Sequence, residues 1–147
     1  MKWQILAVGK PSLHYAKNGT EQYLKRLRRY GTFHLDFLPK DRGAEPNSER
    51  LMQASEGSLR VVLDERGQSW STEELVEKVE NWQLNRVKQV AFLIGGADGH
   101  ASALRDTADH VLRLSRFTMQ HELALLVLVE QLYRVNTVLQ GEPYHRP

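Results

Sequence analysis

Residues 92–100 read FLIGGADGH, an apolar strand that runs directly into a glycine-rich turn. Glycine removes the Cβ atoms that would hold a bound molecule away from backbone amides, and it permits positive φ where a chain reverses sharply. Strand-to-helix turns also contain glycine for packing reasons alone, so the turn by itself leaves a structural role and a binding role open. Strand and turn together predict a strand end in an α/β sheet, with a candidate ligand site beside it.

A second strand and loop follow the glycine turn. Residues 111–115 alternate apolar and polar side chains as a strand does, residues 116–120 form a loop, and a long apolar helix opens at His121. Open α/β sheets bind ligands in a crevice outside the carboxyl ends of their strands. We therefore expect the loops that follow these two strands to meet at one crevice.

Strands and helices alternate along the rest of the chain. The side-chain patterns predict strands at 3–8, 33–38, 59–63, 90–94 and 111–115. They predict helices at 20–30, 101–109 and 121–139, a short helix that ends near Ser55, and a helix that begins at Ser71. Residues 64–67 read as the exit loop of the third strand, and residues 71–74 have the spacing of a capping box. This alternation predicts the α/β class, with an open, largely parallel sheet flanked by helices in one domain spanning residues 1–147.

Length and composition exclude several classes of protein. The chain has 147 residues, enough for one substantial core, and no cysteine, which excludes disulfides and thiolate metal sites. Its six histidines show no metal-ligand spacing, so we expect no metal. The longest apolar stretch, residues 123–129, is too short to span a bilayer, and the first residues read as a strand rather than a signal peptide. We expect a cytoplasmic protein without a membrane partner.

Basic residues gather in one region although the formal net charge is only +2. A local basic face can bind phosphate backbones, and it can equally be the solvated face of a helix, so charge alone leaves both interpretations open. Familiar nucleotide-binding and hydrolase motifs are absent, since GxGxxG, the P-loop, GxSxG and HExxH do not occur. The clustered basic residues are Lys17, Lys25, Arg26, Arg28 and Arg29, with Glu21 as the only nearby acid.

Four stretches together resemble the ribosomal RNA large subunit methyltransferase H family of the SPOUT superfamily. They are the opening MKWQILAVGK, the turn LIGGADG, the run LRLSRFTMQHELALLVLVEQLYR and the ending GEPYHRP. The resemblance implies a C-terminal trefoil knot, an exception to the rule that chains do not thread loops. It also implies methyl transfer from S-adenosylmethionine to N3 of a pseudouridine in 23S ribosomal RNA, by a homodimer acting on assembled ribosomes. The alternative is a noncatalytic RNA-binding or ribosome-associated protein that retains the fold.

The resemblance also assigns residues to the cofactor. Adenine needs an apolar slot with backbone donors and acceptors, which suits the assigned leucines and methionine, while bare glycine lets the sulfonium end approach closely. The leucines could equally be ordinary core residues at strand ends. The cofactor contacts implied by the family are Leu63, Gly95, Leu114, Ser115, Arg116, Phe117, Thr118 and Met119.

The terminal motif Tyr144-His145-Arg146 matches the end of the family and implies a catalytic role for the tail. These residues offer a stacking surface, a group that titrates near neutrality and a phosphate-binding fork. Because they follow Gly141, where the last helix ends, we expect their removal to cost the core little. His121 is a fourth candidate at the target base, and it could also be a helix cap or a core histidine.

Five further positions in and just before the last helix bear on the resemblance. Glu130, Tyr133 and Arg134 recur at helical spacing, which indicates a packing or dimer-face role. Gln120 stands where the family commonly has proline, and this change is expected to loosen the cofactor loop because proline would fix φ. Leu125 stands where the family commonly has arginine, which is expected to remove a phosphate or dimer-face charge and gives the noncatalytic alternative its support.

Overall fold

The structure, a computed structural model, describes residues 1–147. Its five strands form one sheet of order β2-β1-β4-β3-β5 in which every neighbouring pair is parallel, as the sequence predicts. None of its helices combines the length and apolar character needed to cross a membrane. In chain order the elements are β1 (Lys2–Val8), α1 (His14–Leu27), the 3-10 turn η1 (Arg28–Tyr30), β2 (Thr32–Leu38), α2 (Ala44–Ala54), β3 (Leu59–Ser69), α3 (Thr72–Leu84), β4 (Gln89–Ile94), α4 (Ser102–Thr107), β5 (His110–Arg113) and α5 (His121–Leu139).

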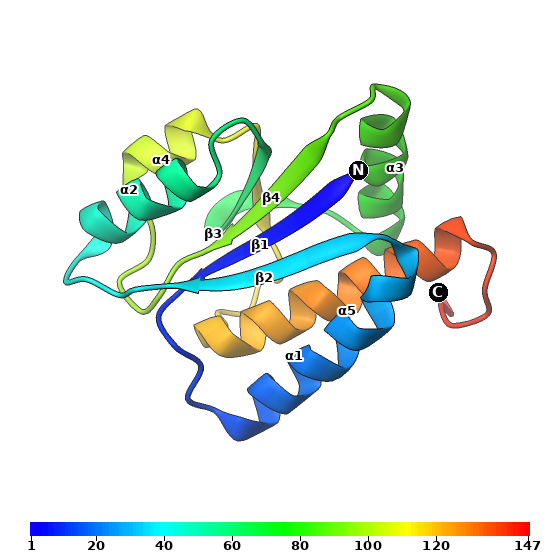
Figure 1. Cartoon of the computed structure of the whole chain (residues 1–147), viewed down its shortest axis with the longest axis horizontal. Helices are drawn as coiled ribbons and strands as arrows, with labels where there is room; N and C mark the ends of the chain where they lie inside the picture. Colours follow the sequence, from blue (N-terminus) through cyan, green and yellow to red (C-terminus); the bar gives the residue numbers. More distant parts are fainter.

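Helices cover both faces of the sheet (Figure 1). Helices α1, α3 and α5 pack on one face in a core that contains Ile5 of β1 and Phe92 of β4. Helices α2 and α4 cover the other face, where the next residues along the same strands, Leu6 and Leu93, are buried. Successive side chains of a strand point to opposite faces, so a parallel sheet covered on both sides needs strands that are apolar throughout.

Helix α1 starts earlier than the sequence predicts. It begins at His14 rather than Thr20, so Gly19 lies inside the helix. A Cβ built on Gly19 would lie 2.8 Å from a methyl carbon of Leu126, because α1 and α5 cross at this point. The glycine therefore permits close helix packing, and its low helix propensity made the predicted start wrong.

Strand β3 is longer than predicted, and the exit loop expected at residues 64–67 is wrong. Leu112 of β5 pairs with Leu63 and, after an irregularity in the register, also with Gln68. Gly67 allows this passage, since a Cβ there would collide with the carbonyl group of Val111. The trefoil knot stays a prediction. Strand β5 itself ends at Arg113, two residues before the predicted end.

Candidate functional site

A cavity of about 380 Å³ lies beside the carboxyl ends of β4 and β5 and against the middle of β3. The loops after β4 and β5 meet there as expected, with residues 63–66 of β3 between them. His121 at the start of α5 also lines the cavity, whereas Arg116 does not. No group of three or more histidine or carboxylate side chains is placed to hold a metal ion. The predicted cofactor residues that line the cavity are Leu63, Gly95, Leu114, Ser115, Phe117, Thr118 and Met119.

The glycines of the turn after β4 differ in whether the structure leaves room for a side chain at their positions. A Cβ built on Gly95 would lie 3.1 Å from Cε1 of His100 and 3.2 Å from the carbonyl group of Gly99. A Cβ on Gly96 would meet only Val8, at an ordinary 3.6 Å. Gly99 has φ of +72°, a conformation that other residues rarely adopt. One wall of the cavity is therefore bare backbone whose shape depends on Gly95 and Gly99.

His100 is a cavity residue that the sequence reasoning missed. It is only 8% exposed, it lines the cavity, and neither ring nitrogen has a hydrogen-bond partner. Burial lowers the pKa of His100 below its ordinary value, which favours the neutral ring. Both ring nitrogens are shielded from solvent and lie near the backbone of Leu63 and Leu93, so the ring is a buried part of the cavity wall. Only its place directly after the glycine turn could have indicated this.

Asp64 forms a second missed feature at the rim of the cavity. Its side chain is 5% exposed and lies 3.5 Å from Arg66 and 3.6 Å from Arg105. Arg105 also donates to the carbonyl oxygen of His100 at 2.8 Å. This network joins the end of β3 to the glycine turn, and the interpretation of residues 64–67 as a loop concealed it.

Gln120 does not loosen the start of α5, so that expectation is wrong. Its side-chain oxygen accepts the backbone N–H groups of Glu122 at 2.7 Å and Leu123 at 3.0 Å. Its φ of −60° is the value that a proline ring would impose. Gln120 therefore keeps the backbone shape of proline and adds a helix cap.

Glu122 is buried behind the start of α5 and ties it to the loop after β1. Its carboxylate accepts the backbone N–H groups of Ser12 at 2.6 Å and Leu13 at 3.1 Å, and the Ser12 hydroxyl at 2.9 Å. Burial alone would raise the pKa of Glu122, but these hydrogen bonds outweigh it and hold the pKa below its ordinary value. The sequence offered no signal for this contact, which joins residues 110 positions apart.

Leu125 does not lie on a charge-bearing surface. It is 4% exposed and belongs to the core between the sheet and α1. We expected that leucine, in place of the arginine common in the family, removes a phosphate or dimer-face charge, and this expectation is wrong for this chain. An arginine here would place its charge among apolar side chains, at a high desolvation cost.

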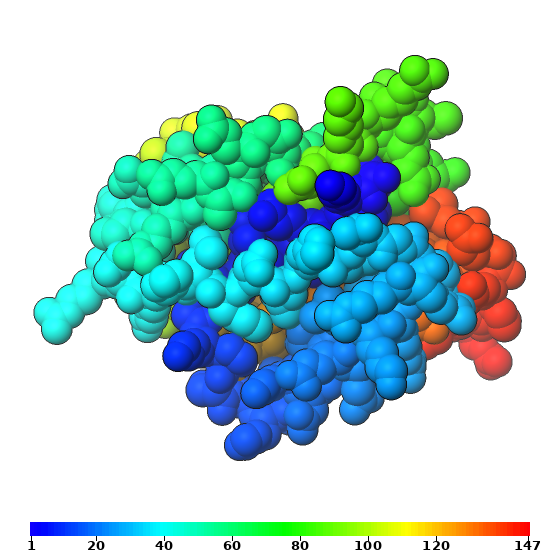
Figure 2. Space-filling view, in the orientation of Figure 1, coloured from blue at the N-terminus to red at the C-terminus, as the bar shows by residue number.

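The tail folds back along α5 onto Glu130 and Arg134, which lie roughly 14 and 20 Å along the helix from His121 at the helical rise of 1.5 Å per residue. Figure 2 shows the segment after α5 lying against the body of the molecule. Tyr144 donates its hydroxyl to Glu130 at 3.0 Å, and His145 lies 3.2 Å from Arg134. The expectation of a tail whose removal costs the core little is therefore wrong. Within one chain, none of the three tail residues lines the cavity.

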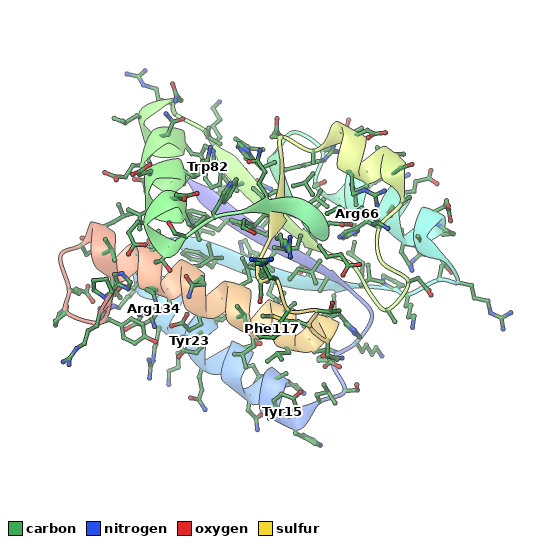
Figure 3. The ribbon with its side chains drawn as sticks, turned by 180° about the vertical axis from the view of Figure 1, so that it is seen from behind. Tyr15, Tyr23, Arg66, Trp82, Phe117 and Arg134 are labelled. Carbon is green, nitrogen blue, oxygen red and sulfur yellow. The ribbon has the colours of Figure 1, made fainter.

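Tyrosines and arginines cluster where the tail meets α1 and α5. Arg26 lies over the rings of Tyr23 and Tyr133, at 5.4 and 5.5 Å from their centroids, and has no carboxylate partner. Arg29 of the predicted basic face pairs with Glu142 at 2.5 Å. Stacked arginines beside exposed basic residues form a surface suited to RNA. Figure 3 shows Arg134 and Tyr23 near this end of α5, away from Phe117 at the other end. The exposed basic residues without ion-pair partners are Lys17, Lys25, Arg26 and Arg28.

A parallel sheet with a glycine-walled cavity at its strand ends defines a small-molecule-binding α/β protein. Solved structures share this fold. The fold is similar to that of a probable methylase family protein from Haemophilus influenzae, with TM-score 0.62 and 12% identity over 99% of this chain and 70% of that one. It is also similar to a tRNA methyltransferase from Aquifex aeolicus, with TM-score 0.59 and 14% identity over 100% of this chain and 77% of that one.

Sequence relatives identify the family. The family model described as predicted SPOUT methyltransferase matches residues 1–145. A ribosomal RNA large subunit methyltransferase H from Thermus thermophilus is 50% identical over 147 residues, which cover 100% of both chains. One from Deinococcus radiodurans is 41% identical over 146 residues, 99% of each chain. The chain therefore belongs to the SPOUT methyltransferase family and, within it, to the family of ribosomal RNA large subunit methyltransferase H.

Proposed function

We propose that the protein transfers a methyl group from S-adenosylmethionine to N3 of a pseudouridine in 23S ribosomal RNA, on assembled ribosomes in the cytoplasm. The observation that carries this proposal is the glycine-walled cavity, which gathers seven of the eight residues assigned to the cofactor. Relatives named ribosomal RNA large subunit methyltransferase H, which match the whole chain, support the choice of substrate.

The cavity fits S-adenosylmethionine in size and in the character of its walls. Its volume of about 380 Å³ lies in the range of small-molecule pockets. Leu63, Leu114 and Met119 would hold the adenine, and bare backbone at Gly95 would accept the approach of the sulfonium end. When bound, the cofactor supplies an electrophilic methyl group on sulfur.

The residues of the chain must orient the target base and release its N3 proton. In-line transfer requires the nitrogen to face the methyl group at close range, so positioning supplies much of the rate. His121 lines the cavity, and we propose that it lies at the target base. We propose that Arg116, which lies outside the cavity lining, faces the RNA instead of the cofactor.

We propose that two copies of the chain form the active site together, because the tail of one chain is bound to Glu130 and Arg134 and does not line its own cavity. Phe117 is 85% exposed and Tyr15 is 60% exposed, and both lie on the side of α1 and α5 seen in Figure 3. A two-fold pair that buries this face would place the tail of one protomer near the cavity of its partner.

The noncatalytic alternative loses its support. It rests on Leu125 as a missing surface charge, and Leu125 lies in the core. We therefore propose the enzyme alone.

Mapping of 23S ribosomal RNA tests the proposal. A methyl group on N3 of a pseudouridine blocks base pairing, so reverse transcriptase stops beside it. We expect a stop in RNA from cells that carry this chain, none from cells that lack it, and restoration by purified protein with S-adenosylmethionine and ribosomes. Ribosomes that remain unmodified would overturn the proposed function.

A further inference from the structure

We propose that Glu130 and Arg134 are positioning residues that hold Tyr144 and His145 as neutral anchors, so that the tail presents Arg146 to the RNA as its only free polar side chain. This inference rests on the proposed function, because it assigns the tail residues their roles in that reaction. It concerns contacts between α5, α3 and the tail that lie outside the cavity.

The hydroxyl of Tyr144 is fully used. A carboxylate only accepts hydrogen bonds, so Tyr144 donates its proton to Glu130 at 3.0 Å. The hydroxyl of Tyr23, 3.2 Å away, must then donate to the oxygen of Tyr144. Burial, followed by these hydrogen bonds with Tyr23 and Glu130, raises the pKa of Tyr144. The phenol therefore keeps its proton and does not act as a base.

Both ring nitrogens of His145 are also used. Arginine only donates hydrogen bonds, so Nδ1 of His145, 3.2 Å from a terminal nitrogen of Arg134, must accept. Nε2 then carries the proton and donates to Glu73 at 3.1 Å. The pKa of Glu73 is lowered by a hydrogen bond from its own backbone amide and then by His145, which keeps this acceptor ionised. His145 is thereby held as the neutral Nε2–H tautomer.

Glu130 sets the orientation of Arg134. One carboxylate oxygen of Glu130 accepts from Nε of Arg134 at 3.1 Å and from one terminal nitrogen at 2.5 Å. The other terminal nitrogen is left for His145, and the guanidinium lies 4.8 Å from the ring centroid of Tyr144. Glu130 therefore controls both anchors at once, Tyr144 directly and His145 through Arg134.

Arg146 is the tail residue that remains available. It is exposed, and its side chain makes no hydrogen bond or ion pair in the chain. A guanidinium stays protonated at all relevant pH values and binds phosphate through a planar fork. It can position RNA but cannot accept the N3 proton. The tail therefore positions the substrate, and the proton leaves by another route.

Nitrogen NMR of the histidine rings tests the tautomer directly in the complete protein. At about pH 8, above the ordinary pKa of imidazole, we expect His145 to carry its proton on Nε2. The Arg134→Met change removes the donor to Nδ1, so the spectrum should show a mixture of both tautomers. Finding Nδ1–H, or a doubly protonated ring, in the parent would overturn the inference.

Kinetics then separate positioning from folding. For Arg134→Met we expect kcat on ribosomes to fall roughly 100-fold through misplacement of the tail, with S-adenosylmethionine affinity unchanged. Glu130→Gln keeps an acceptor of the same shape and should retain more activity than Glu130→Ala. Lys88→Met, an exposed change between α3 and β4, is the control and should match the parent.

Two kinds of failure remain distinguishable. Parental kcat in Arg134→Met would overturn the inference even if the methyltransferase activity is present. A parent that does not methylate ribosomes would overturn the proposed function, and the tautomer of His145 would still decide whether Arg134 and Glu130 hold the tail as described. If Arg134→Met does not fold, the parent spectrum and the Glu130→Gln rate decide.

Discussion

The two ends of α5 are built in different ways. At its amino end the chain leaves a cavity lined by glycine backbone, apolar side chains and charged side chains such as Asp64 and Arg113. At its carboxyl end, tyrosine, histidine and arginine side chains join α1, α3 and the tail through hydrogen bonds in which each polar group has a partner. One end has unused capacity for a ligand, and the other has almost none.

This difference indicates which end of α5 suits the cofactor and which suits the RNA. A small cofactor needs space and bare backbone, whereas a large RNA needs a rigid surface with projecting charge. The tail contacts Glu130 and Arg134, roughly 14 and 20 Å along α5 from His121, and we propose that a single chain supplies two half-sites. The predictions below ask whether each half fails separately.

Deletion of residues 144–147 should have the largest effect. Without the tail, we expect methylation of ribosomes to fall at least about 100-fold through lost positioning, with S-adenosylmethionine affinity within twofold of the parent. The melting temperature should also fall, because Tyr144 and His145 lose their partners. Calorimetry, thermal unfolding and a methylation assay measure the three quantities. Methylation at the parental rate would remove the tail from the active site.

Gly95→Val should damage the other half-site. Its Cβ would press on the His100 ring and the Gly99 backbone at 3.1 to 3.2 Å, so the turn must move into the cavity. We expect S-adenosylmethionine affinity to fall at least about 30-fold, or about 2 kcal/mol. Gly96→Ala is the matched control, since its Cβ meets only ordinary contacts. Equal binding by Gly95→Val and the parent would show that the cavity is not the cofactor site.

The pH dependence of stability in Glu122→Gln should test whether Glu122 holds the start of α5 beside the cavity. The folded pKa of Glu122 lies below its ordinary value of 4.5, so its stabilising effect is present at neutral pH and is lost as pH falls through the folded pKa. The variant should be less stable than the parent by about 1 kcal/mol at neutral pH, and the gap should close in acid. Glu21→Gln, an exposed change on α1, should show no such gap. A gap that is constant with pH would contradict this role.

Gln120→Pro should have the smallest effect. The backbone already has φ of −60° at this position, so proline fits. The cap to Glu122 and Leu123 is lost, together with long side-chain contacts to His121 at 3.4 Å and to the Glu122 carboxylate at 3.5 Å. We expect the free energy of unfolding to change by less than about 1 kcal/mol, with cofactor affinity unchanged. Chemical denaturation and calorimetry measure both. A large loss of affinity would mean that the glutamine side chain itself supports the ligand.

Local patterns predict the sheet well because strands buried on both faces are apolar throughout. The errors fall where a distant contact decides the local structure. From the sequence, Gly19 suggests a helix break, but in the fold it lies against Leu126 inside a helix. Gly67 suggests a loop, but it lies beside Val111 within a strand. Propensity describes only the neighbours along the chain.

The residues of the candidate site are likewise predictable only where no distant contact decides their role. Resemblance to the family predicts the residues from Leu114 to Met119 that border the cavity, except Arg116. It does not predict that Tyr144 meets Tyr23, because these residues are 121 positions apart and the contact depends on the packing of α1 against α5. His100 and Glu122 likewise have roles that only the fold reveals.

Mixed dimers test most directly whether the cavity of one protomer works with the tail of its partner. Gly95→Val subunits and subunits lacking residues 144–147 should each be inactive alone. Co-expressed in equal amounts, they should recover about one quarter of the parental rate, because half the dimers are mixed and each has one intact site. A mixture as inactive as either variant alone, with mixed dimers present, would contradict the shared site.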